Sequence, residues 1–171
     1  MSTIIRLFLR IALLRANPQD IPHAPVLAVL AVLAYGVMSL LISGAQPIPI
    51  GKAVFSAIVD TILLVGLGWA VLWIKDLPQR RVQTIAALAG TGAIVETLVW
   101  PLQIYLVHLG STPSATGDFA SLIVLLVVMW QIVIIGHIMR HALDISFPFG
   151  AGIAVLYAIF SIKVAFFIVA N

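Results

Sequence analysis

The sequence predicts an all-α protein, a polytopic bundle of five transmembrane helices with one short amphipathic helix at its N-terminus. Of its 171 residues, 63% are hydrophobic and 9% are charged, whereas about 25% of the residues in an ordinary soluble domain are charged. The apolar residues lie in runs of roughly 20, the length that an α-helix needs to cross a hydrocarbon core. These observations predict a single membrane domain, residues 1–171.

Residues 2–16 are predicted to form the amphipathic helix. Asn17-Pro18 ends it, because proline disfavours helical geometry in the residue before it. Arg6 and Arg10 lie four residues apart on one face, and the segment is too short to span a bilayer. We expect an interfacial helix in the cytoplasmic headgroup layer, with both arginines toward anionic membrane lipids. The alternative is that this helix packs on the bundle.

Five apolar spans follow this helix. Short connections predict that consecutive spans are antiparallel neighbours. Pro101 is expected to bend the third span, and the small residues of that span predict a central packing surface. The spans cover about 24–43, 51–74, 82–108, 119–139 and 148–170, and the small residues are Ala86, Ala89, Gly90, Gly92 and Ala93.

The basic residues predict how the chain crosses the membrane. Lys52 lies on the opposite side from the other basic residues outside the spans, and Asp118 is the lone acid of the loops on that side. Because basic loops remain in the cytoplasm, we expect a cytoplasmic N-terminus, with Asn171 outside. Topology also explains the net charge of +3 better than nucleic acid binding does, so we expect no nucleic acid partner. The cytoplasmic set is Arg6, Arg10, Arg15, Lys75, Arg80, Arg81 and Arg140.

Three ionisable residues fall inside predicted spans, and such residues usually face a bundle interior or water. On a rise of about 1.5 Å per residue, Asp60 lies roughly 14 Å, Glu96 roughly 17 Å and Lys163 roughly 10 Å below the outer ends of their spans. We expect Lys163 to form an ion pair with one acid, and Asp60 is the favoured partner. The predicted intramembrane polar cluster is Asp60, Glu96, Lys163, Ser56 and Gln103.

Two interpretations of this cluster remain open. It is either a structural ion pair that holds helices in register, which we favour, or an ion or proton site open to the outside. Catalysis is not expected, because Ser121 and Ser161 are isolated in apolar runs and the chain has no cysteine. The four histidines lie at span ends, where none needs a ligand, so we expect no cofactor and no metal.

The order of features resembles small bacterial members of the Yip1-like membrane family. The likeness rests on the arm LFLRIALLRANPQDIPHAP (7–25) and on the Gly/Ala-rich segment ALAGTGAIVETL (87–98). The resemblance implies a short cytoplasmic N-terminal arm, five spans and almost no C-terminal tail. It also implies a location in the bacterial inner membrane, and no functional residues transfer with it.

Three classes of function compete for a protein of this kind. A non-catalytic scaffold, or an accessory subunit of a larger membrane assembly, is favoured. Because the loops are short, the helix surfaces are what such a protein would use to bind, and its partners would be other membrane subunits. A small transporter or ion or proton pathway would use Asp60, Glu96 and Lys163. A haem- or pigment-binding subunit rests on the histidines alone.

Overall fold

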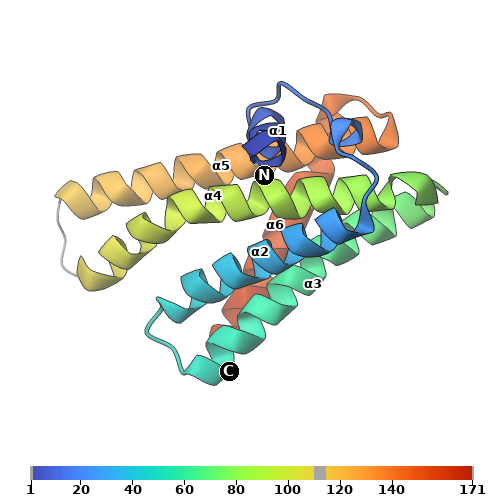
Figure 1. The fold of residues 1–171 in the computed structure, drawn as a ribbon. Helices are drawn as coiled ribbons and strands as arrows, with labels where there is room; N and C mark the ends of the chain where they lie inside the picture. The colour runs from blue at the N-terminus through green and yellow to red at the C-terminus, as the bar shows by residue number, and fades with distance from the viewer. Residues whose placement is uncertain (1, 110–114, 171) are drawn as a thin grey trace.

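The computed structural model describes residues 2–109 and 115–170, and all regular structure in this part of the chain is helical. One-turn 3-10 helices at Pro18–Asp20 and Pro78–Arg80 lie in two of the connections. The helices α2 to α6 are each long and apolar enough to cross a membrane. This confirms an all-α, multi-pass membrane protein, while Asn171 lies outside the described residues. The α-helices are α1 Ser2–Ala12, α2 Pro25–Gly44, α3 Ile50–Ile74, α4 Arg81–Leu109, α5 Ala115–Leu143 and α6 Phe147–Ala170 (Figure 1).

The N-terminal helix ends at Ala12, four residues before its predicted end at residue 16. Leu14 has a positive φ of 60°. Its N–H donates to Ile11 O at 2.9 Å, and the N–H of Arg15 donates to Arg10 O at 2.7 Å. This pair of bonds is a Schellman motif, which usually contains glycine at the left-handed position. Leucine is a good helix former, so the sequence carried no sign of this end.

The bounds of four spans differ from the predicted ones by at most one residue, but α5 is four residues longer at each end. The apolar run ends at the polar residues on either side, but the helix continues through them. Asp118 lies in the first turn and Arg140 and His141 lie in the last. Both positions favour those charges because of the helix dipole.

The helix α4 occupies the centre of the bundle, as its small residues predict. Figure 1 shows it between α5 on one side and α2 with α3 on the other, and α6 crosses behind them. Its buried residues run almost without a break from Ala86 to Ala93. The most extensive contact joins α4 to α2, which runs parallel to it, so the prediction that consecutive spans are the main neighbours is incomplete. Close approach over glycine and alanine explains this contact.

One end of the bundle is tied together by polar side chains; we call it the basic end, because Lys75, Arg80, Arg81 and Arg140 lie there. Arg80 donates to the carbonyls of His141 at 3.3 Å and Ala142 at 3.0 Å. It also pairs with Asp144 at 2.7 Å. These bonds satisfy carbonyl groups that the end of α5 would otherwise leave free.

The arm α1 packs across α4 and α5 (Figure 1). Phe8 fits against Gly90, where an added Cβ would lie 2.5 Å from its ring. Trp130 Nε1 donates to Ala12 O at 3.0 Å. The arm therefore packs on the bundle, as the alternative interpretation predicts. Arg6 and Arg10 are exposed on its other side, and their contact with lipid headgroups stays a prediction.

Candidate functional site: a polar cluster inside the bundle

Asp60 of α3 is the centre of a polar cluster between the helices. Its Oδ2 accepts hydrogen bonds from the Tyr35 hydroxyl at 2.6 Å and from Ser39 Oγ at 3.0 Å. Its Oδ1 accepts a hydrogen bond from Ser161 Oγ at 3.2 Å. Tyr35 and Ser39 belong to α2 and Ser161 belongs to α6. Three hydroxyl donors from two neighbouring helices therefore surround one carboxyl group.

A glycine in α4 makes room for the tyrosine of this cluster. A Cβ added to Gly92 would lie 2.8 Å from the Tyr35 ring. Any larger residue would push the ring away from α4 and carry the hydroxyl away from Asp60. Tyr35 and Ser39 are both buried, and they lie one turn apart on the same face of α2. The parallel packing of α2 on α4 thus positions two of the three donors.

A second carboxyl group joins the cluster from α4. Glu96 interacts electrostatically with Asp60 and with the Tyr35 hydroxyl. Its Oε2 is buried without a hydrogen-bond partner, and so is Oε1 of Gln131 in α5. Tyr157 of α6 lies close enough to Asp60 to interact with it as well. Gln131 lies beside the cluster, because its Nε2 would be 3.8 Å from the same added Cβ at Gly92 that would meet the Tyr35 ring. The cluster thus combines side chains of α2, α3, α4 and α6, with Gln131 of α5 next to it, and two acceptor atoms there have no partner.

The cluster lies at mid-depth in the bundle. On a rise of about 1.5 Å per residue, Asp60 is about 21 Å from the last residue of α3 and Glu96 is about 22 Å from the first residue of α4. Gln131 and Ser161 lie about 18 Å and 21 Å from the same end along α5 and α6. Measured along the helices, each of these residues is far from the basic end, so burial of a polar atom there without a partner is costly.

The predicted ion pair of Lys163 with Asp60 or Glu96 is wrong. Within residues 2–109 and 115–170 the ion pair that the structure contains joins Arg80 to Asp144. Lys163 is exposed on the surface of α6. It follows Ser161 by two residues, which is a rotation of about 200° around a helix. Because Ser161 points at Asp60, Lys163 points away, so similar depth did not mean a shared face.

The other predicted members of the cluster lie toward the opposite end of the bundle. Ser56 is one turn from Asp60 along α3, and Gln103 is two turns beyond Glu96 along α4. Both are half-buried, and in the described part of the chain neither joins the hydrogen bonds around Asp60. Lys52 donates to Val169 O at 3.1 Å and so links α3 to α6 at that end.

Sequence reasoning missed four members of the cluster, Tyr35, Ser39, Gln131 and Tyr157, and dismissed Ser161 as isolated. One signal was available for most of them. Tyr35 and Ser39 are four residues apart, as are Tyr157 and Ser161. Two polar residues at this spacing in an apolar helix mark one polar face. Gln131 carries no such signal.

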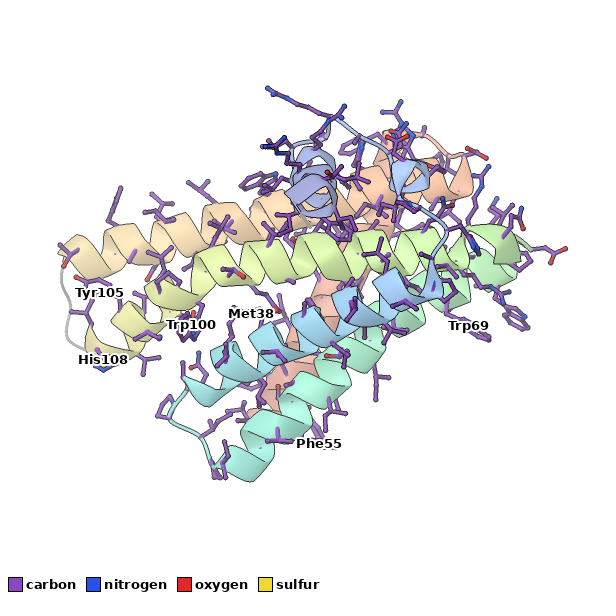
Figure 2. All side chains as sticks on the ribbon, in the orientation of Figure 1. Met38, Phe55, Trp69, Trp100, Tyr105 and His108 are labelled. Carbon is purple, nitrogen blue, oxygen red and sulfur yellow. The ribbon has the colours of Figure 1, made fainter. Side chains whose placement is uncertain are left out.

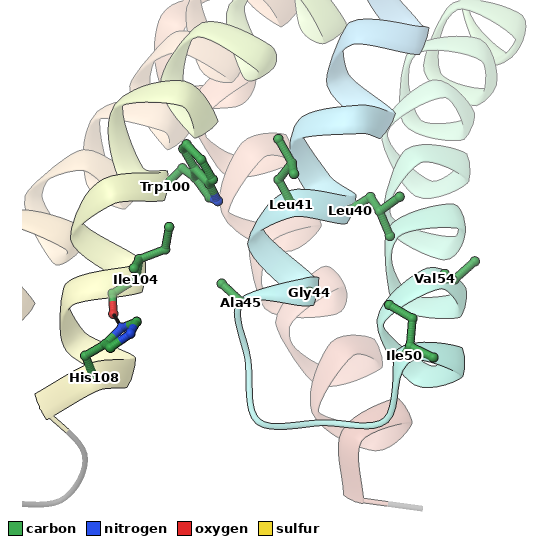
Figure 3. A pocket seen from close by; sticks show the side chains of 9 residues that line it. All are labelled: Leu40, Leu41, Gly44, Ala45, Ile50, Val54, Trp100, Ile104 and His108. Carbon is green, nitrogen blue, oxygen red and sulfur yellow. Dashed lines mark hydrogen bonds between the residues drawn. The ribbon is translucent and has the colours of Figure 1, made fainter.

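A groove opens from the opposite end of the bundle toward this cluster. Figure 3 shows it between α2 and α3 on one side and α4 on the other, with a volume of about 480 Å³. Its inner wall includes Leu40 and Trp100, which are next to Ser39 and one turn from Glu96. Pro101 lies inside α4, and Figure 1 shows the last part of α4 bending away from α5, so the predicted bend is present.

Two of the four histidines make hydrogen bonds to backbone carbonyls. His137 Nε2 lies 3.0 Å from Ala16 O, so this nitrogen is the donor, because a carbonyl oxygen only accepts. His141 packs edge-on against His137 with ring centroids 4.6 Å apart. His108 Nδ1 likewise lies 2.8 Å from Ile104 O. Among the described residues no three His, Cys, Asp or Glu side chains gather as a metal site would require.

Comparison with known proteins adds no relative: no protein-family model, curated protein or solved structure matches the chain. The resemblance to the Yip1-like family stays a prediction, and the function must be argued from the cluster itself.

Proposed function

We propose that this chain is a small membrane transport protein that binds and releases a proton at Asp60 and Glu96. The observation that carries the proposal is the pair of carboxyl groups in one buried cluster. Among the described residues, neither acid has a basic side chain within ion-pair distance. A structural ion pair, the interpretation favoured from the sequence, required the cation that is missing here.

The electrostatics of the pair favour the exchange of one proton. Two negative charges this deep in a bundle repel each other strongly, because the surroundings screen them little. Asp60 accepts three hydroxyl hydrogen bonds, which stabilise a carboxylate, whereas Glu96 Oε2 has no donor beside it. A proton on Glu96 removes the repulsion between the two carboxyl groups.

The groove provides a route for this proton. Its inner wall lies one turn from Glu96, whereas the other side of the cluster is closed by side chains such as Leu64, Leu72 and Leu88, which are at most 2% exposed. The predicted topology places the groove on the outside of the membrane. The arrangement therefore supports a conformation in which the site exchanges protons with the outside alone.

Proton flux into proteoliposomes tests the proposal. Purified protein is reconstituted around a pH-sensitive dye, and a membrane potential drives protons inward. We expect flux with the wild type and its loss in Asp60→Asn and in Glu96→Gln, while Lys163→Met and Asp118→Asn, which alter charges outside the cluster, retain it. Infrared difference spectra of the same samples should contain a titrating carboxyl signal that Glu96→Gln removes. Flux that survives both cluster substitutions, or a wild type without flux, would contradict the proposal.

The accessory-subunit function remains a second candidate, because α6 leaves most of its surface uncovered by the described part of the chain. Only 6% of the α6 span is buried, compared with 44% of the span that contains α4. Its contacts are chiefly with α5 and α3, so its remaining surface is free for lipid or for another subunit. Copurification of a stoichiometric membrane partner after mild detergent extraction, together with absent proton flux, would favour this candidate over transport.

A further inference from the structure

A cation–aromatic stack lies at the basic end, remote from the polar cluster. The guanidinium of Arg81 lies 5.5 Å from the ring of Trp69. The rings of Trp69 and Trp73 stack at 5.9 Å with an angle of 8° between them. They are 48% and 62% exposed, and Figure 2 shows Trp69 pointing outward from this end of α3. An ordered cation thus lies beside two exposed indole rings.

Two adjacent arginines differ sharply at this position. Arg80 is occupied by Asp144 and by the last carbonyls of α5. Arg81 has no acidic or carbonyl partner among the described residues, and its Nε is buried without a hydrogen bond. A guanidinium carries five N–H donors in a planar fork. Packing against Trp69 holds this fork in place, and its donors remain unfilled.

The chemistry of the missing partner follows from the location. A planar fork of N–H donors matches the oxygens of a phosphate. Tryptophan at a membrane surface lies at the level of lipid headgroups, and exposed Lys75 follows Trp73 by two residues. Basic residues beside a membrane attract anionic lipids. The phosphate of a lipid is therefore the partner that reaches this surface.

We propose that Arg81, Trp69 and Trp73 form a binding site for an anionic phospholipid. Arg81 binds the phosphate, Lys75 adds attraction for the net negative headgroup, and the two indole rings cover the glycerol region. This site is distinct from the arm, where Arg6 and Arg10 were predicted to face lipid. It does not depend on proton transport, so the two proposals can fail separately.

Quenching of tryptophan fluorescence by spin-labelled lipid tests this site. The protein is reconstituted in phosphatidylcholine bilayers with a small fraction of spin-labelled phosphatidylglycerol or, in parallel, spin-labelled phosphatidylcholine. We expect the wild type to favour phosphatidylglycerol and Arg81→Gln to reduce that preference about fivefold, which corresponds to about 1 kcal/mol for one basic residue at a surface. Arg81→Lys, which keeps the charge without the fork, should lose part of it.

The controls separate this site from other sources of the signal. The double variant Arg6→Gln/Arg10→Gln should keep the preference, because the arm is a different surface. Unchanged helical content by circular dichroism shows that Arg81→Gln is folded. Equal quenching by both lipids in the wild type, or a preference that Arg81→Gln leaves intact, would overturn the proposal. Displacement of the labelled lipid by millimolar inorganic phosphate would instead identify a soluble anion as the ligand and overturn the lipid assignment.

Discussion

The two halves of the bundle are built differently on either side of the polar cluster. In the basic half, glycine and alanine bring α4 close to its neighbours, the arm covers α4 and α5, and Arg80 ties a connection to the end of α5. In the opposite half the last part of α4 bends away from α5, and a groove lies between α4 on one side and α2 and α3 on the other (Figures 1 and 3). Close packing of small residues makes one half tight, and the other half is more open. The cluster lies where these halves meet, so its two sides differ: one is closely packed and the other is near the groove.

Thiol labelling should reveal this difference most directly, since the chain has no native cysteine. Leu41→Cys in the groove should react with a membrane-impermeant maleimide, because the proposed proton route requires water there. Leu88→Cys should not react, because Leu88 is 1% exposed. Leu122→Cys is the matched control: Leu122 is 51% exposed but lines none of the described pockets, so we expect it to face lipid.

Labelling of intact cells at Leu41→Cys also tests whether the groove faces outside. Equal reactivity at Leu41→Cys and Leu88→Cys would contradict the division into halves.

Glycine substitutions should separate the halves by stability. A Cβ at Gly150, in the basic half, would collide with Gly136 O and lie 3.0 Å from Arg140 N, and backbone atoms cannot move aside. We expect Gly150→Ala to destabilise the bundle by about 3 kcal/mol. Gly51, in the opposite half, has nothing within 4 Å of such an atom, so Gly51→Ala should be neutral or stabilise α3 by about 0.5 kcal/mol. Reversible unfolding in mixed micelles measures both, and similar losses would show that the halves pack alike.

Polar ties between helices should give the smallest effect. Arg80→Gln removes two bonds to carbonyls at the end of α5 and the pair with Asp144. We expect a loss of about 1–2 kcal/mol, mostly from the carbonyls, because Asp144 is largely exposed. Lys52→Gln removes one exposed bond to Val169 O in the opposite half and should change stability by less than about 0.5 kcal/mol. The same unfolding assay compares them, and a larger effect at Lys52 would reverse the expected order.

Of the seven residues of the candidate site, the sequence analysis identified the two carboxyl groups. Asp60 and Glu96 were identified because charged residues inside apolar spans are rare and conspicuous. Lys163 was identified by the same rule but placed wrongly, because the rule gives depth and says nothing of direction around the helix. Tyr35 and Tyr157 escaped notice because the one signal that marked them, a serine four residues further along the same helix face, was overlooked.

The sequence by itself determined the class, the number and the approximate bounds of the long helices, because these depend on local quantities. Hydropathy over about 20 residues is enough to identify a span, and the small residues of α4 identified it as the centre. Only the tertiary structure decided that α2 packs chiefly on α4 and that Tyr35, Ser39 and Ser161 meet at Asp60. It also decided that Lys163 points outward. These facts depend on the rotation of each helix about its axis, and in a chain this apolar on all faces the sequence pattern specifies that rotation only weakly.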